Sequence, residues 1–588
     1  MNAVTSSQEP DGEESSRRER PTRKTKRPAV LVQAVLGGVI VAAISSAVLC
    51  WFGVHQFVGF DSFWHVFIAR QETWKAMWRE ILENAHPPLF YLLLKAAIFS
   101  LGQSFLAYRA LSIAGIAIAT VFVAWSTATI TRAALAIIAA AAFGLSASAI
   151  DTGLEVRSYG VFLAAAMAAT AGWLEWLRSM PRTTPIRSRL LFGFGMSIAV
   201  LTHYSAFFVL LAMLATPAVL VVSSARWRIK FRLELARHSR VVAAMFGAPI
   251  LVAVSVFLVH ARHYKNGLGH VVGFMYQPGA ESRWTFILRN CRNLLLLFVP
   301  TFGQTTVVVT AVWAFLCLGL VVATVRRLPR GRVDAVPLVM FVLLLLSNLA
   351  AGLAGRYPFG GNLRHEIFLF PFAILALFAG VEVARRAAPG RWSSRRLWVG
   401  TTTAVVVAST GFGLATFPVF PQPRAQIDRF RGDFPDEPTV LVDQFNLIVF
   451  FGHYYDWQWH LRWEQVGPPM WQVWEVRHGD KHFAVCRARE WVLDFSRPST
   501  YAQLSDCLAR SKTVKVAVFR TQPLGSTPSW DVAETAALAA SLAPTARLDL
   551  QALDVDGNNI YALFQAAGPH GARGAVDAAS KSPQAEGR

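Results

Sequence analysis

Long apolar segments separated by short polar connections dominate the chain up to residue 417. A membrane-spanning helix needs roughly 20 mostly apolar residues. Segments of this kind lie at 29–52, 87–102, 106–130, 133–150, 158–177, 190–204, 205–223, 241–260, 305–325, 336–354, 366–384 and 397–417. The pattern predicts a mainly α fold, a polytopic membrane helix bundle with about 11–13 spans.

Basic residues gather in the polar connections on one side of this predicted bundle. Connections rich in Lys and Arg stay in the cytoplasm, and the richest ones lie at 178–189, 224–240, 326–332 and 385–396. The N-terminal tail, residues 1–28, is also basic and is expected to be cytoplasmic and disordered.

This orientation places loops 53–86 and 151–158 outside, although three apolar segments lie between them. An even number of crossings is needed, so one of the three is expected to be short, tilted or re-entrant. Segment 87–102 is the shortest and contains Lys95.

The pattern changes after Phe417, where strand-like and helix-like stretches alternate. Strands are expected near Thr439, at Lys515–Thr521 and at "NIYALFQ", and a helix is expected at Asp531–Leu542. Alternation of this kind predicts a small α/β domain, which we place at 418–567 on the extracytoplasmic side. The low-complexity tail, residues 568–588, is expected to be disordered.

Composition supports a membrane protein and removes other classes. Of the 588 residues, 54% are apolar and only 16% are charged, against about 25% charged in soluble domains. The formal charge is 57 − 36 = +21, which fits basic cytoplasmic loops, and no nucleic-acid motif accompanies it. Five scattered cysteines show no metal-ligand spacing, so we predict no metal and no cofactor.

Ionisable and aromatic polar groups gather at the predicted external ends of the spans. Asp61 lies in the loop 53–86, which also contains Trp64, Trp74 and Trp78. Further candidates follow in later external segments: Asp151, Glu155, Arg157, Tyr159, His203, Tyr204, Lys265, Arg356, Arg364 and His365. A lipid phosphate held near the membrane face needs cations, preferably Arg, and a carboxylate on the same face could accept a proton from an acceptor hydroxyl. Individually, such residues are also typical of interfacial groups that only snorkel.

Several short motifs occur in a characteristic order along the bundle. After Asp61 come "HPPLFYLLLK" (His86–Lys95), "YRALSIAGI" (Tyr108–Ile116), "EVRSYG" (Glu155–Gly160), "LTHYSAFF" (Leu201–Phe208) and "RYPFGGNLRHEIFLFPF" (Arg356–Phe372). With these motifs the chain resembles the GT-C glycosyltransferases that use polyprenyl-phosphate sugars, such as protein mannosyltransferases and lipid A aminoarabinose transferases. The resemblance covers roughly residues 30–415.

The resemblance implies a catalytic mechanism and roles for the candidate residues. Asp61 would be the general base of an inverting transfer to an acceptor glycan, lipid or protein, at the outer side of the cytoplasmic membrane. His86, Glu155, Arg157, Tyr159, His203 and Tyr204 would bind substrate, and Arg356, Arg364, His365 and Lys265 would bind the donor phosphate. Many relatives have a second acidic residue after the Asp, where this chain has Ser62. This departure favours action without a metal.

Two other functions compete with this one. A transporter or flippase of lipid-linked sugars would place ionisable groups near the bilayer midplane, where only Lys95 is conspicuous. A catalytically inactive scaffold for the C-terminal domain is opposed by the presence of Asp61.

Overall fold

The computed structural model describes most of the predicted bundle and the strands of the C-terminal domain. The described residues are 26–56, 58, 60–71, 73–82, 84, 86–102, 104–180, 185–263, 274–298, 322, 325–326, 332–361, 363–388, 390 and 394–417, together with seven strands after residue 438.

The bundle consists of helices whose bounds follow the apolar segments. They are α1 (Lys26–His55), α2 (Phe60–Ala69), α3 (Trp74–Leu82), α4 (Leu89–Leu101), α5 (Phe105–Ile130), α6 (Ala133–Gly144), α7 (Ala147–Leu154), α8 (Tyr159–Ser179), α9 (Ile186–Thr202), α10 (Ala206–Ser223), α11 (Ala225–Val259), α12 (Arg283–Phe298), α14 (Val336–Leu353), α15 (Leu363–Glu366), α16 (Phe370–Ala387) and α17 (Arg395–Ala415). Every predicted span coincides with a helix except 305–325, which lies outside the described residues.

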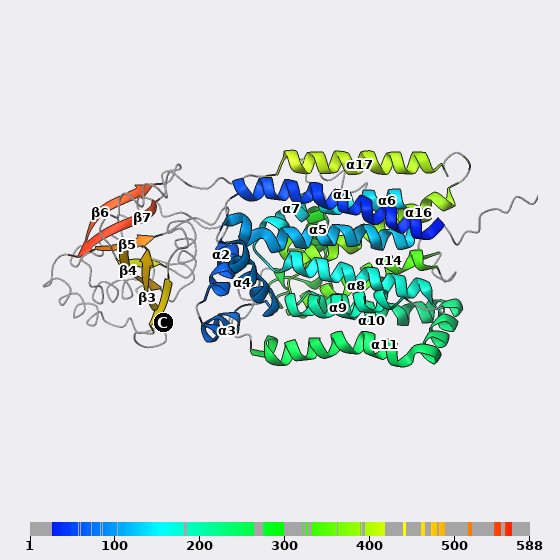
Figure 1. The fold of residues 1–588 in the computed structure, drawn as a ribbon, viewed down its shortest axis with the longest axis horizontal. Coiled ribbons are helices and arrows are strands. Elements are labelled where there is room, and N and C mark those ends of the chain that lie inside the picture. Colours follow the sequence, from blue (N-terminus) through cyan, green and yellow to red (C-terminus); the bar gives the residue numbers. More distant parts are fainter. Residues whose placement is uncertain are drawn as a thin grey trace, which may run out of the picture.

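These helices make the chain a multi-pass membrane protein. Within the described residues, eight helices are long and apolar enough to cross a bilayer, and the pair α6–α7, bent by 52°, makes a ninth if it forms one span. The 17-residue helix α9 lies alongside α8 in the bundle (Figure 1). The mainly α fold predicted from the sequence is confirmed.

Helix α4 accounts for the extra apolar segment between the two loops that the sequence predicts to be external. It has only 13 residues, too few to cross a bilayer, and it lies with α2 and α3 at one end of the bundle (Figure 1). We call this end the α2–α4 end. Lys95 of α4 donates hydrogen bonds to the carbonyls of Ala69 and Gln71 at 3.1 and 2.8 Å. Its charge therefore caps the C-terminal end of α2.

The basic connection at 224–240 is helical, which differs from the expectation of a loop. It forms the first half of α11, with non-helical backbone at His238, and the ammonium of Lys230 lies 4.3 Å from the ring centre of Trp227. Figure 1 shows this bend at the end of the bundle opposite to α2–α4. The basic residues therefore gather away from the α2–α4 end.

Helices α5 and α8 touch backbone to backbone. An added Cβ at Gly115 would lie 2.2 Å from the carbonyl carbon of Gly160, and one at Gly160 would lie 2.6 Å from the carbonyl oxygen of Ser112. Small residues permit this close approach between membrane helices. The contact brings the start of α8, which follows "EVRS", against α5.

This contact predicts a specific sensitivity to side-chain size. Gly115→Leu is expected to lower the free energy of unfolding by about 1–3 kcal/mol, because the helices must separate to admit the side chain. Gly247→Leu in α11 is the matched control, since an added Cβ there meets no atom within 4 Å. The thermal midpoints of the two detergent-solubilised variants compare them, and equal midpoints would contradict the expectation.

The C-terminal domain contains a mixed seven-stranded sheet. Its strands are β1 (Thr439–Val442), β2 (His460–Glu464), β3 (Gln472–His478), β4 (Lys481–Arg487), β5 (Lys515–Phe519), β6 (Ala546–Leu553) and β7 (Asn559–Ala566), in the order β2-β3-β4-β1-β5-β7-β6. The central β1 pairs in parallel with β4 and β5, as an α/β domain requires. Strands β1, β5 and β7 were predicted, whereas the predicted helix Asp531–Leu542 lies outside the described residues.

Candidate functional site

A carboxylate between two guanidinium groups forms the centre of the α2–α4 end. Glu155 follows α7 directly, and its Oε1 lies 2.6 Å from Nε of Arg364, while its Oε2 lies 3.6 Å from Nε of Arg157. The Glu155 and Arg157 side chains are 13% and 10% exposed, whereas Arg364 is 37% exposed. Asp151, in the helix α7 just before Glu155, is close enough to interact electrostatically with all three of these groups.

Three histidines line up beside these charges. The ring of His86 lies 5.0 Å from that of His65 and 5.3 Å from that of His203, between ring centres. All three residues are buried. Ser158 lies 3.2 Å from Nδ1 of His86, and Tyr159 packs 4.8 Å from the His203 ring. The predicted substrate residues His86 and His203 therefore share one aromatic and polar wall with Tyr159.

Burial keeps two of these histidines neutral. Burial lowers the pKa of His203 to about 3, and the nearby charges of His365 and Arg157 act in the same direction. The pKa of His86 is also well below its ordinary value, first because of burial and then because of His65, His203, Arg157 and His365. Neutral imidazoles can accept or donate hydrogen bonds to a ligand without adding charge.

This burial predicts an acid-sensitive fold. Between pH 6.5 and about 3 the unfolded chain binds a proton at His203 that the folded chain does not, so stability falls as the pH falls below 6.5. The expected loss is about 1.4 kcal/mol per pH unit for this residue. His203→Gln should flatten the pH dependence of the unfolding midpoint over this range, and an unchanged slope would contradict the assignment.

The first residues of α2 are attached to this cluster through a serine. Oγ of Ser62 accepts a hydrogen bond from the backbone N–H of Val156 at 3.0 Å, between Glu155 and Arg157. Asp61 lies in the first turn of α2, and its side chain lies outside the described residues. The backbone that carries Asp61 is therefore adjacent to the backbone that carries the ion pairs.

A second carboxylate holds the loop that supplies Arg364. Oε1 of buried Glu366 accepts from the N–H of Gly360 at 2.8 Å, and Oε2 accepts from Nδ2 of Asn348 at 2.6 Å. Gly360 has φ +69°, and an added Cβ there would lie 2.2 Å from the carbonyl oxygen of Asn290. Only glycine fits this turn, which fixes the loop against α12 and α14.

The same loop is attached to the start of α10. The hydroxyl of Tyr357 lies 2.7 Å from Oγ of Ser205 and 3.4 Å from the carbonyl oxygen of His365. Burial raises the pKa of the Tyr357 phenol, so this group stays protonated. His365 is thereby positioned close enough to His203 for their charges to interact.

The remaining predicted residues occupy other places. Tyr204 bonds to Nδ1 of His260 at the end of α11, and Nε2 of His260 lies 2.8 Å from the carbonyl oxygen of Ile81 in α3. Tyr204 therefore takes part in fixing α3 to α11, apart from the charged cluster. Arg356 is exposed at the surface, and Lys265 lies outside the described residues.

Sequence reasoning overlooked a buried arginine near the site. Arg109, 1% exposed, donates hydrogen bonds to the carbonyls of Leu154, Gly53 and Gln56 at 2.6, 2.5 and 3.1 Å. It joins the ends of α1 and α7 to α5. Its place in "YRALSIAGI" was the available signal, because an arginine inside an apolar span needs buried acceptors.

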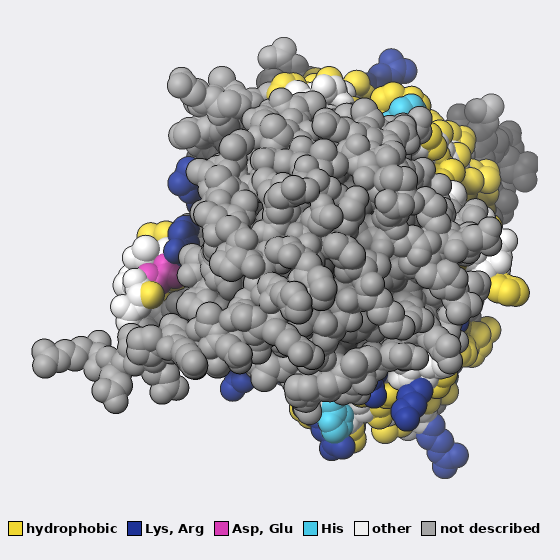
Figure 2. All heavy atoms as spheres, turned by 90° about the vertical axis from the view of Figure 1, so that its left-hand side faces the viewer, with side chains coloured by type: hydrophobic (Ala, Val, Ile, Leu, Met, Phe, Trp, Pro, Cys, Tyr) yellow, Lys and Arg dark blue, Asp and Glu magenta, His cyan; other side chains and the backbone are white. Residues whose placement is uncertain are grey.

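The surroundings of this end are those of a membrane interface. In the end-on view, the side chains visible around the rim are hydrophobic, basic and polar, with His and an acidic group among them (Figure 2). Long basic side chains of this kind reach from apolar surface to the headgroup layer. Among the described residues no group of three His, Cys, Asp or Glu side chains could hold a metal ion.

The fold of most of the chain is similar to that of solved structures. ArnT from Cupriavidus metallidurans bound to undecaprenyl phosphate superimposes with a TM-score of 0.51 over 89% of this chain and 97% of ArnT, at 11% identity. This chain has the GT-C fold. The apo state of ArnT gives a TM-score of 0.50 with the same coverage. The archaeal oligosaccharyltransferase AglB from Archaeoglobus fulgidus, with an inhibitory peptide and a dolichol-phosphate, gives 0.43 over 84% of this chain and 69% of AglB, at 12% identity. No family model and no curated relative matches the sequence.

Proposed function

We propose that the chain is a membrane glycosyltransferase that moves a sugar from a polyprenyl-phosphate donor to an acceptor hydroxyl on a glycan, lipid or protein. The observation that carries this proposal is the cluster of Glu155, Arg157 and Arg364 beside the start of α2. A fold shared with ArnT, whose structure contains undecaprenyl phosphate, supports the same donor class.

The proposed reaction is a single inverting displacement. The acceptor oxygen forms a bond to the anomeric carbon of the sugar as the bond from that carbon to the phosphate oxygen breaks. The proton of the acceptor hydroxyl passes to the carboxylate of Asp61, and the electron pair of the broken bond stays on the leaving polyprenyl phosphate. The hydrogen bond between Ser62 and Val156 supports this role for Asp61, because it holds the first turn of α2 beside the charged cluster.

The leaving phosphate requires cations, and Arg364 is the best placed of the predicted ones. Its guanidinium is 37% exposed and already ordered by Glu155, so a phosphate can approach it without a large loss of side-chain entropy. His365 and Arg157 lie in the same region, and Arg356 and Lys265 remain proposed contacts for the outer part of the phosphate. Glu155 would then orient Arg364 and contact a sugar hydroxyl.

The proposed orientation places this chemistry outside the cytoplasm. Four arginines gather around Glu382 and Asp334: Arg132, Arg332, Arg385 and Arg386. They lie near α6 and the end of α16, away from the α2–α4 end (Figure 1). Lys and Arg favour the cytoplasmic side. We therefore propose that the protein lies in the cytoplasmic membrane, with its N-terminus in the cytoplasm and its C-terminal domain on the extracytoplasmic side.

A flippase for lipid-linked sugars is the alternative, and Lys95 distinguishes the two. A transported headgroup needs ionisable groups near the midplane, whereas Lys95 bonds to two carbonyls at the α2–α4 end. The test uses protein in lipid nanodiscs supplied with a panel of radiolabelled polyprenyl-phosphate sugars and envelope acceptors. We expect release of polyprenyl phosphate with label in the acceptor. Movement of intact donor across proteoliposomes without such release would favour the flippase.

A further inference from the structure

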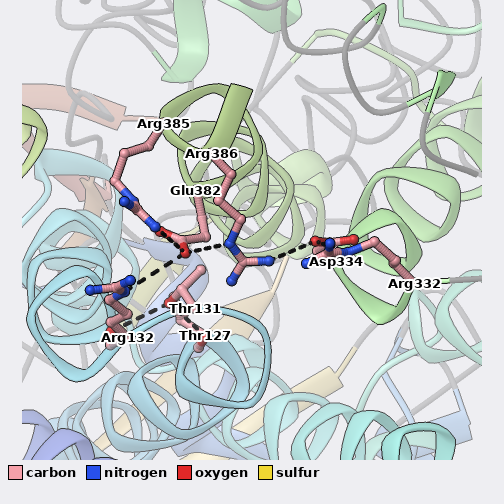
Figure 3. A network of polar contacts seen from close by, with 8 residues as sticks. All are labelled: Thr127, Thr131, Arg132, Arg332, Asp334, Glu382, Arg385 and Arg386. Carbon is pink, nitrogen blue, oxygen red and sulfur yellow. Dashed lines mark hydrogen bonds and ion pairs between the residues drawn. The ribbon is translucent and has the colours of Figure 1, made fainter. Parts of the chain in front are cut away.

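A second charged cluster lies at the end of the bundle opposite to the proposed catalytic site. Two acidic side chains, Glu382 near the end of α16 and Asp334 just before α14, are only 0% and 4% exposed. Four arginines surround them: Arg132, Arg332, Arg385 and Arg386 (Figure 3). The cluster is unrelated to the glycosyl transfer proposed above, which takes place at the α2–α4 end.

Three of these arginines already donate hydrogen bonds to the two carboxylates. Glu382 accepts two hydrogen bonds from Arg385, at 2.9 and 3.0 Å, and one from Arg386 at 2.7 Å. Arg132 stays at 3.9 Å from Oε1 of Glu382, and its side chain is 45% exposed. Four guanidinium groups and two carboxylates give the cluster a net charge of +2. Arg132 and Arg332 are its most exposed arginines, each with 45% of its side chain accessible to solvent.

A helix terminus adds to this positive field. Arg132 is the N-cap residue of the 12-residue helix α6, and its own side chain makes no capping hydrogen bond. The first N–H groups of a helix attract anions. Burial lowers the pKa of Arg132, and the charges of Arg385, Arg395 and Arg386 lower it further, against the opposite effect of Glu382. Arg132 is therefore surrounded by more positive than negative charge.

The depth of the cluster identifies the anion. Arg132 lies two residues after the end of α5 at Ile130, and Arg385 and Arg386 lie in the last turn of α16. Both helices are long enough to span a bilayer. The ends of spanning helices lie in the headgroup layer, where basic sites between helices bind anionic lipid headgroups. We propose that Arg132, Arg332 and the N-terminus of α6 bind the phosphate of an anionic phospholipid.

The proposal gives the two kinds of arginine different roles. Arg385 and Arg386 both donate to buried Glu382, and removing either would weaken the neutralisation of a buried charge, which destabilises the fold. Arg132 and Arg332 are half-exposed. Arg332 donates to Asp334 at 3.0 Å, but Asp334 keeps Arg386 at 3.1 Å when Arg332 is replaced. Only Arg132 and Arg332 are suitable for a binding test.

The test compares lipid binding in wild type and in the double variant Arg132→Gln/Arg332→Gln. Protein in phosphatidylcholine nanodiscs is titrated with phosphatidylglycerol, and bound lipid is counted by native mass spectrometry. The variant is expected to bind phosphatidylglycerol roughly 30-fold more weakly, which corresponds to about 1 kcal/mol for each arginine. Arg187→Gln is the matched control, because Arg187 is 58% exposed, lies at the start of α9 and pairs with Glu175 outside the cluster.

The outcomes distinguish a lipid site from a free-anion site and from a diffuse attraction of lipid. Retained phosphatidylglycerol affinity in the double variant, or an equal loss in Arg187→Gln, would overturn the proposal. Saturation by inorganic phosphate alone would identify a free-anion site and would also overturn it. If the double variant does not fold, the salt dependence of the wild type decides: a headgroup held by arginines is released at high ionic strength, and salt-independent binding contradicts the proposal.

Discussion

Asp61→Asn is expected to abolish most sugar transfer while the protein still folds and binds the donor lipid. The amide keeps the shape of the side chain but cannot accept the proton of the acceptor hydroxyl. A positioned general base contributes about 10²–10⁴-fold in rate, and we expect a loss of this size. Turnover with a radiolabelled donor and retention of undecaprenyl phosphate measure the two properties separately.

Glu155→Gln is the control for this prediction because Glu155 is the carboxylate that forms ion pairs with Arg157 and Arg364. If Glu155 only orients Arg364, this variant should lose donor affinity and keep a measurable turnover at saturating donor. A variant Asp61→Asn with near-normal turnover beside an inactive Glu155→Gln would assign the base to Glu155. Ser62→Ala should lie between the two, because it removes the hydrogen bond to Val156 and leaves both carboxylates.

Arg364→Ala is expected to weaken binding of the donor phosphate by roughly 10- to 150-fold. A hydrogen bond to a charged group contributes about 1.5–3 kcal/mol, and 1.4 kcal/mol corresponds to tenfold in affinity. The guanidinium is exposed enough to meet a ligand and is held by Glu155 at 2.6 Å. Equilibrium binding of labelled undecaprenyl phosphate to the purified variant gives the affinity directly.

Arg356→Ala separates a specific contact from a general electrostatic effect. Arg356 lies in the same loop and is exposed, so its removal changes the net charge equally. We expect a smaller loss than for Arg364→Ala. Unchanged affinity in both variants would exclude this loop as the phosphate site, and equal losses would indicate only a diffuse attraction of the lipid.

The helices could be predicted because the bilayer imposes a long apolar run on each span. The prediction failed for segments that do not follow this rule. Helix α4 has 13 residues and its Lys95 bonds to backbone carbonyls of another segment, a contact with no local signal. The basic stretch 224–240 resembled a loop, yet it continues as α11 because the solvated face of a helix accepts closely spaced charges.

The site could be predicted in part. The motifs indicated His86, Glu155, Arg157, His203 and Arg364, and the structure brings these residues together. Tyr204 lies apart from this cluster. Its neighbour His203 faces the cluster, whereas Tyr204 bonds to His260. His65 and Arg109 were overlooked because their hydrogen-bond partners Tyr91 and Leu154 lie 26 and 45 residues away. Such pairings depend on helix packing rather than on spacing.

The contact between Ile81 and His260 also has a consequence for how the chain is made. The carbonyl of Ile81 meets its imidazole partner only after 179 further residues have been synthesised. At roughly 5–20 residues per second, translation takes about 10–40 s to cover that distance. During this interval α2 and α3 have already left the ribosome, but α11, which ends beside His260, has not yet been completed. The loop that carries Asp61 is therefore assembled late, and a nascent chain arrested before residue 260 should expose it to protease.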